Sequence, residues 1–179
     1  PVPRTREAAA GTQSVLVANL EVGYGAGESI RLVVAEVLAQ RARRVFPESF
    51  IEVIGPVVPG RNPLLLVVSA QTPLGVIEEG VRSSWGDLTA PATEGELEGI
   101  RRQIAAMSAA TWSGSSGRAR RCAAVAAGAA IWRASSDMEM EILSVSVEEV
   151  NATLGAVSVW ENIPTTGAGV LPIAEFDGS

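Results

Sequence analysis

The sequence predicts an α+β domain, in which a mixed or antiparallel sheet is covered on one face by several helices. Three observations support this fold class. Short β-branched apolar runs are bounded by glycine and proline, other segments carry apolar residues at helical spacing, and two capping boxes mark helix starts. The expected order of elements is β-α-β-β-α-α-α-α-β.

The first half of the chain predicts a strand, a helix and a hairpin. Residues 13–25 form an apolar run closed by glycines, which is typical of a strand. Residues 29–45 predict an amphipathic helix that Pro47 ends. Residues 50–58 and 64–70 read as two strands that pair through the turn residues at 59–63. The apolar positions of the helix are Ile30, Val33, Val34, Val37 and Leu38.

Helices dominate the second half. Thr72 as N-cap and Pro73 at the first helical position open a helix that runs to about Trp85, before Gly86. Thr93 with Glu96 forms a capping box for a helix that reaches residue 110 or 112.

After a flexible break at 113–117, the Ala-rich residues 118–134 predict a further helix. Ser146 with Glu149 starts a short helix that ends near Gly155, and residues 156–162 predict the last strand. We expect residues 1–12 to be a linker, 13–163 the domain and 164–179 a flexible tail.

Composition excludes several classes of function. A net charge of −6 disfavours nucleic-acid binding, which requires a basic surface. The 179 residues contain no histidine, so they cannot supply a His-dependent catalytic triad or a His-ligated zinc site. One cysteine, Cys122, permits no internal disulfide. We expect a reducing, cytoplasmic location, since no signal peptide or membrane-length apolar run is recognisable.

Three local patterns have a structural interpretation that we favour over a functional one. GYGAG at 23–27 lies between a strand and a helix, but Glu28 replaces the third glycine of a dinucleotide loop, so a tight turn is favoured. Cys122 has arginine neighbours but no histidine, which favours a buried thiol. Asp137, Glu139 and Glu141 lack a glycine-centred calcium loop and predict a solvated face.

Arg41, Arg43 and Arg44 form the densest positive cluster, in RARRVFPESF at 41–50. Cations in the last turn of a helix interact favourably with its dipole, so a solvated helix end explains them. The alternative is a clamp for an anion or for carbonyl groups of a partner or peptide. The residues alone leave both interpretations open.

Three segments resemble the pitrilysin/insulinase-type zinc peptidases, a family that includes the mitochondrial processing peptidases. QSVLVANLEVGYGAGESIRLVVAEVLAQ resembles the opening strand and long helix of a family half, and PATEGELEGIRRQIAA resembles a later helix start. MEMEILSVSVEEVNATL resembles the late signature, an apolar run before Ser/Thr-x-Glu-Glu/Asp-Val. The resemblance covers residues 13–163.

The resemblance implies one of the two similar halves that face each other across a chamber. One half of the family carries H-x-x-E-H and a distant Glu ligand. This chain, without histidine, resembles the non-catalytic half, so no catalytic residue, metal ligand or cofactor is expected in it, and zinc is expected in a partner subunit or domain. Self-association of the chain is the alternative to such a partner. Peptide is the implied substrate, and neither nucleic acid nor membrane is an expected partner.

The same resemblance implies substrate-binding residues. The second half of the family often supplies an Arg and, seven residues later, a Tyr that hold the substrate. Arg43 and Phe50 have that spacing, with Arg44 as the alternative arginine, and Phe50 lacks the tyrosine hydroxyl. The alternatives to a peptidase half are a purely structural subunit, as in the respiratory bc1 complex, and a peptide-binding module.

Overall fold

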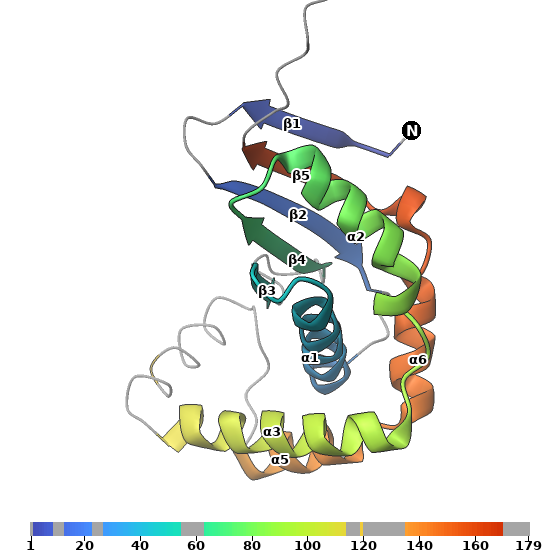
Figure 1. Ribbon diagram of the computed structural model, residues 1–179. Coiled ribbons are helices and arrows are strands. Elements are labelled where there is room, and N and C mark those ends of the chain that lie inside the picture. Colours follow the sequence, from blue (N-terminus) through green and yellow to red (C-terminus); the bar gives the residue numbers. More distant parts are fainter. Residues whose placement is uncertain are drawn as a thin grey trace, which may run out of the picture.

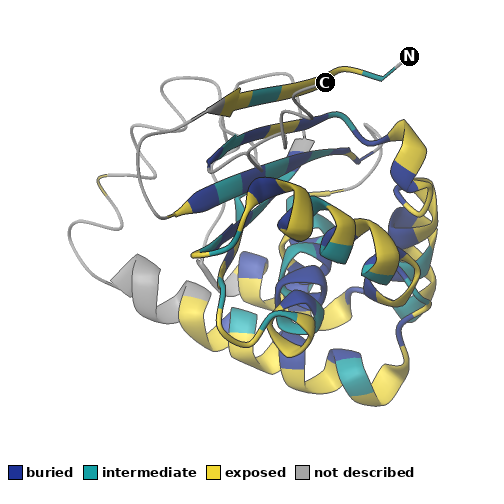
Figure 2. Ribbon diagram, turned by 45° about the horizontal axis from the view of Figure 1, so that its top comes forward, coloured by how far each residue is buried: buried dark blue, intermediate teal, exposed yellow. Residues whose placement is uncertain are grey.

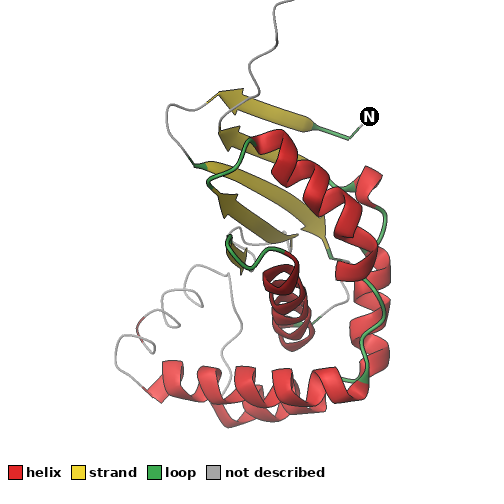
Figure 3. Cartoon of the chain, in the orientation of Figure 1, coloured by secondary structure: helices red, strands yellow, loops and turns green. Residues whose placement is uncertain are grey.

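A five-stranded mixed sheet with helices packed on one face forms the protein, which confirms the predicted α+β class (Figures 1 and 3). The computed structural model describes residues 2–8, 13–22, 27–54, 63–113, 119 and 135–169. The strand order is β1-β5-β2-β4-β3, with β1 and β5 parallel and the other neighbours antiparallel. The strands are β1 (Arg4–Ala8), β2 (Ser14–Glu21), β3 (Phe50–Ile54), β4 (Pro63–Ala70) and β5 (Thr165–Gly169).

Two layers of helix cover the sheet. Both α1 and α2 contact the strands, while α3 and α5 lie side by side against α1 (Figure 1). The helices are α1 (Glu28–Val45), α2 (Leu74–Leu88), α3 (Glu94–Ser113), α5 (Ser135–Ser144) and α6 (Val147–Ala156), followed by the 3-10 turn η1 (Trp160–Asn162).

Strand register explains which face is covered. Leu16, Ala18 and Leu20 of β2 lie opposite Val68, Leu66 and Leu64 of β4, so all six side chains share one face. All six are buried and belong to the same hydrophobic core as the buried apolar residues of α1 and α2. Figure 2 shows buried segments, in dark blue, on both the strands and the helices. The helix residues are Val33, Val34, Val37 and Leu38 of α1, and Ile77, Val81 and Trp85 of α2.

The opposite face of the sheet is apolar but only partly covered. Val15 and Val17 of β2 share this face with Leu65 and Val67 of β4, and all four are partly exposed. Phe50, at the sheet edge in β3, pairs with Ser69 on the same face and is 60% exposed. We call this surface the open sheet face.

The predicted linker at 1–12 contains β1, and the predicted tail at 164–179 contains β5, so both predictions are wrong in part. Strand β1 is polar because it lies at the sheet edge, where Arg6 Nε donates to Glu78 of α2 at 2.9 Å. Strand β5 consists of small residues because α2 approaches it closely. Because β1 is polar and β5 consists of small residues, neither strand shows the alternation of apolar residues by which a strand is recognised in a sequence.

The last predicted strand, at 156–162, is also wrong. Helix α6 ends at Ala156, and the chain then turns into η1. Val157 and Trp160 are buried while Val159 is 50% exposed, which is the spacing of a turn. The Trp160 ring lies 5.0 Å from that of Trp85, whose Nε1 donates to the Val157 carbonyl at 2.9 Å.

Helix ends agree with the sequence in part. The Ser146 capping box of α6 is confirmed in both directions. Pro73 rather than Thr72 is the N-cap of α2, and this helix passes Gly86 because Leu88 extends its buried face.

The hairpin of β3 and β4 is confirmed. Helix α5 was not predicted, and the expected helix at 118–134 lies outside the described residues apart from residue 119.

No helix within the described ranges is long and apolar enough to cross a membrane.

Close packing of β5 against α2 gives a test of the sheet. A Cβ on Gly167 would lie 2.7 Å from Leu74 Cδ1, in the core at the start of α2. We expect Gly167→Ala to lower the free energy of unfolding by about 1–3 kcal/mol because the core must shift. Gly155→Ala is the control, since its Cβ would meet nothing within 4 Å in helix α6. Urea denaturation measures both, and an equally stable Gly167→Ala would contradict the placement of β5.

Candidate functional site

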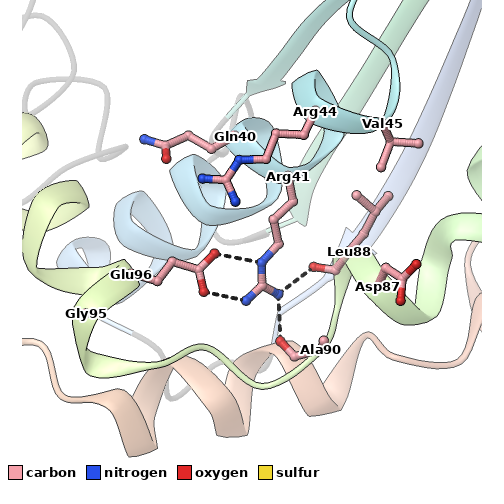
Figure 4. A pocket seen from close by; sticks show the side chains of 9 residues that line it. All are labelled: Gln40, Arg41, Arg44, Val45, Asp87, Leu88, Ala90, Gly95 and Glu96. Atoms are coloured by element: carbon pink, nitrogen blue, oxygen red, sulfur yellow. Dashed lines mark hydrogen bonds and ion pairs between the residues drawn. The ribbon is translucent and has the colours of Figure 1, made fainter.

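Arg41 joins three helices through its guanidinium group (Figure 4). Its Nε and Nη2 donate to the two carboxylate oxygens of Glu96 in α3, at 2.9 and 2.7 Å. Its Nη1 donates to the carbonyls of Leu88, at the end of α2, and Ala90, at 2.9 and 2.6 Å. The planar fork of arginine suits this arrangement, which lysine could not reproduce. Arg41 is therefore a carbonyl and carboxylate clamp, but one that acts inside the chain.

Glu96 is shared between Arg41 and the start of its own helix. Its backbone N–H donates to Thr93 Oγ1 at 3.3 Å, which is one half of the predicted capping box, but its side chain accepts from Arg41 instead of closing the box. Hydrogen bonding to Arg41 lowers the pKa of the Glu96 carboxyl, against the opposing effect of burial, and the charges of Arg41 and Arg44 add to the lowering. Glu96 is thus held in its ionised form.

A hollow of about 620 Å³ lies beside this clamp, where the ends of α1 and α2 meet the start of α3. Arg44 and Val45 lie on its α1 side and are exposed, and Asp87 lines it from α2 (Figure 4). The opposite charges of Arg44, Asp87 and Glu96 give the hollow a mixed polar lining.

Arg43 and Phe50 line other surfaces. Arg43 lies in a groove between α1, β3, α3 and α5, and its Nη1 donates to Glu36 Oε1 at 3.3 Å. Phe50 lines a polar hollow with Gln13, Glu48 and Gln71 at the end of the sheet. The structure therefore does not bring the three predicted site residues, Arg43, Arg44 and Phe50, to one cavity within the chain.

The groove around Arg43 was missed by the sequence analysis. Each of its α1 residues has another three or four positions away, which places them on one helix face. That spacing was present in the sequence, but the contributions of β3, α3 and α5 depend on packing. The α1 residues are Glu28, Leu32, Ala35, Glu36, Ala39 and Arg43.

The described residues do not fit a zinc site. They contain no group of three or more His, Cys, Asp or Glu that could hold a metal ion. Of the three carboxylates predicted to form a solvated face on α5, Asp137 and Glu139 are exposed and Glu141 is half-buried. Cys122 and residues 23–26 of the GYGAG segment lie outside the described residues, while Gly27 is the N-cap of α1.

Comparison with known proteins identifies the fold. No protein-family model matches the sequence, and no curated protein matches it. The structure is similar to the M16 peptidase inactive domain from Pseudomonas fluorescens, with a TM-score of 0.66 and 13% identity, over 95% of this chain and 44% of that one. It is also similar to the inactive peptidase domain of a candidate zinc protease from Bordetella parapertussis, with a TM-score of 0.66 and 15% identity, over 93% and 94%.

A third similar structure is a chain of complex III from Candida albicans, with a TM-score of 0.72 and 11% identity, over 94% of this chain and 46% of that one. The chain thus spans less than half of the Pseudomonas and Candida chains but nearly all of the Bordetella domain. The protein has the fold of an inactive M16 peptidase half.

Replacing Arg41 by lysine should lower the stability of the chain strongly, although the substitution is conservative. Arg41→Lys keeps the charge but cannot serve four acceptors in this geometry, so we expect the free energy of unfolding to fall by about 2–3 kcal/mol. Arg82→Lys is the control, because Arg82 is half exposed and its hydrogen-bond partner among the described residues is Glu79, three residues earlier. Chemical denaturation measures the free energy of unfolding of both variants. If Arg41→Lys lowers it by less than Arg82→Lys does, the structural role of Arg41 is contradicted.

Acid should weaken the clamp. The pKa of Glu96 is lowered from 4.5 in the folded chain, so its contribution is complete above that pH and is lost as the pH falls through the lowered value. We expect wild type to be more stable than Glu96→Gln at pH 7, with the difference shrinking below about pH 4.5. Urea denaturation of both chains across pH 3–7 measures the difference in their free energies of unfolding. A difference that does not change with pH would contradict the lowered pKa of Glu96.

Proposed function

We propose that the chain is the non-catalytic half of a metallopeptidase of this fold, and that it pairs with a separate half that carries zinc. The observation that supports this most strongly is the match of nearly the whole chain to an inactive peptidase domain that is nearly as long. The absence of histidine agrees with it, because an H-x-x-E-H site needs two. Zinc-bound water in the partner would supply the hydrolytic nucleophile.

The open sheet face is the proposed pairing surface. Its apolar side chains from β2 and β4 are partly exposed, and the described helices pack on the other face. Pairing would remove this apolar area from water, which favours association by about 25 cal/mol for each Å² buried. The chain would thereby form one wall of a chamber for a peptide substrate.

Arg43 is the proposed contact with the substrate. Its side chain is 50% exposed, and its ion pair with Glu36, at 3.3 Å, leaves other N–H donors of the guanidinium for a carbonyl or carboxylate. Arg44 is the alternative, since it too is exposed, in the neighbouring hollow. Phe50 can offer only apolar contact, because it carries no hydroxyl.

A purely structural subunit is the second candidate function. Two observations favour it: the similarity to a complex III chain, and the phenylalanine at the position where a tyrosine hydroxyl would assist catalysis. In that case the chain would retain the pairing surface without contacting a substrate.

Reconstitution distinguishes the two candidates. We expect the chain to co-purify with an H-x-x-E-H partner and peptide cleavage to require both chains. Arg43→Ala should then reduce turnover at least about tenfold, as expected for the loss of a charged substrate contact, without changing assembly. Arg82→Ala is the matched control, since Arg82 is 52% exposed and lies on α2.

Unchanged turnover in Arg43→Ala would remove Arg43 from the mechanism and favour Arg44, tested in the same way. Peptide cleavage by the partner alone would favour the structural subunit.

A further inference from the structure

Strand β1 is attached to the sheet without an apolar anchor. It lies at the sheet edge, where its backbone pairs with β5. Its described side chains, at positions 4–7, are exposed or half-buried, and none of them belongs to the hydrophobic core. Strand β3, at the opposite edge, differs in this respect, since its Ile51 is buried in the core. Burial of apolar side chains therefore holds β3 in place but not β1.

Two arginines supply the side-chain attachment of β1. Arg6 donates to both carboxylate oxygens of Glu78 in α2, through Nε at 2.9 Å and through Nη2. Arg4 Nη1 lies 3.4 Å from the same carboxylate. Both arginines also donate to the hydroxyl of Thr165 in β5, Arg4 at 3.1 Å and Arg6 at 3.0 Å. Glu78 is therefore the charged group that both arginines share.

The remaining contact of Arg4 is with the turn after α6. Its Nη2 donates to the Trp160 carbonyl at 3.3 Å, and its guanidinium carbon lies 5.3 Å from the centre of the Trp160 ring. Arg4 is exposed, and Arg6 and Glu78 are half-buried, so all three charges remain in contact with water. Ion pairs of this kind contribute less to stability than buried apolar side chains do.

We propose that β1 is a detachable edge strand, which leaves the sheet while β2, β4, β5 and the helices stay folded, and that Glu78 is the residue that holds it in place. Segments with few buried apolar contacts open at a lower free energy than the whole chain. Opening leaves the outer backbone groups of β5 unpaired, and an edge of this kind can pair with a strand of another chain. The opening does not depend on pairing with a zinc-bearing half, so it can be tested on the full chain alone.

Hydrogen exchange of single amides, followed by NMR, tests the proposal. The Thr165 N–H donates to the Pro3 carbonyl at 3.2 Å and reports on the attachment of β1. The amides of residues 15–18 of β2, which lie between β4 and β5, report on the centre of the sheet. We expect the protection factor of the Thr165 amide to be at least about tenfold lower than theirs. It should also depend little on urea, because local opening exposes little surface.

Glu78→Gln removes the shared charge, and Glu79→Gln is the matched control. Glu79 is the next residue of α2 and pairs with Arg82 on the exposed surface. We expect Glu78→Gln to lower the protection factor of the Thr165 amide about a further tenfold, as for the loss of hydrogen bonds to a charged group. The protection factors of residues 15–18 should stay unchanged, and Glu79→Gln should change neither set.

Equal protection and equal urea dependence of the Thr165 amide and residues 15–18 in the wild-type chain would overturn the proposal, because β1 would then open only with the whole sheet. The role of Glu78 would be overturned if Glu78→Gln lowers the protection of residues 15–18 as much as that of Thr165. An effect of Glu79→Gln as large as that of Glu78→Gln would overturn it as well.

Discussion

The helical layer depends on one guanidinium group. Arg41 donates to a carboxylate at the start of α3, to the carbonyl of Leu88 at the end of α2 and to that of Ala90 in the loop that follows, and it does so from α1, which lies between the sheet and the outer helices. The last carbonyls of a helix lack partners within their own helix, as that of Leu88 does. A single side chain thereby satisfies carbonyls that would otherwise need water and sets the positions of three helices. The hollow beside Arg44 and the groove beside Arg43 both have their shape from these positions.

The sheet has two unlike faces, and this difference relates the fold to its proposed role. One face is buried by α1 and α2, while the open sheet face carries valine and leucine side chains that remain partly exposed. A strand order with β1 and β3 at the edges keeps the buried centre of the sheet on β2 and β4. Such an arrangement suits one half of a two-part shell, in which the second half would cover the open sheet face of the first.

Much of the fold could be predicted because local patterns specified it. The apolar spacing from Ile30 to Leu38 defined α1, and the Ser146–Glu149 capping box defined the start of α6. Strand β5 could not be predicted, because its small residues are selected by the approach of Leu74 from another element. Strand β1 was missed for a related reason, since an edge strand held by Arg6 and Glu78 looks like a polar linker.

The candidate site was predictable only as a set of residue types. The arginine cluster at 41–44 was recognised, but the different surroundings of its three arginines could not be predicted from the sequence. Arg41 points to α3, while Arg43 and Arg44 line different hollows. Long-range partners such as Glu96 decide this, and they lie 55 residues away. The hypothesis was a clamp that faces a partner or a peptide, whereas Arg41 donates to groups of its own chain. For Arg43 and Arg44 that role stays a prediction.

Native mass spectrometry of the chain mixed with a candidate H-x-x-E-H peptidase half tests the proposed pairing most directly. We expect a one-to-one complex with one zinc ion, and a free chain that binds no zinc. A chain that binds zinc by itself, or that remains separate from every H-x-x-E-H partner supplied, would contradict the assignment as a non-catalytic half.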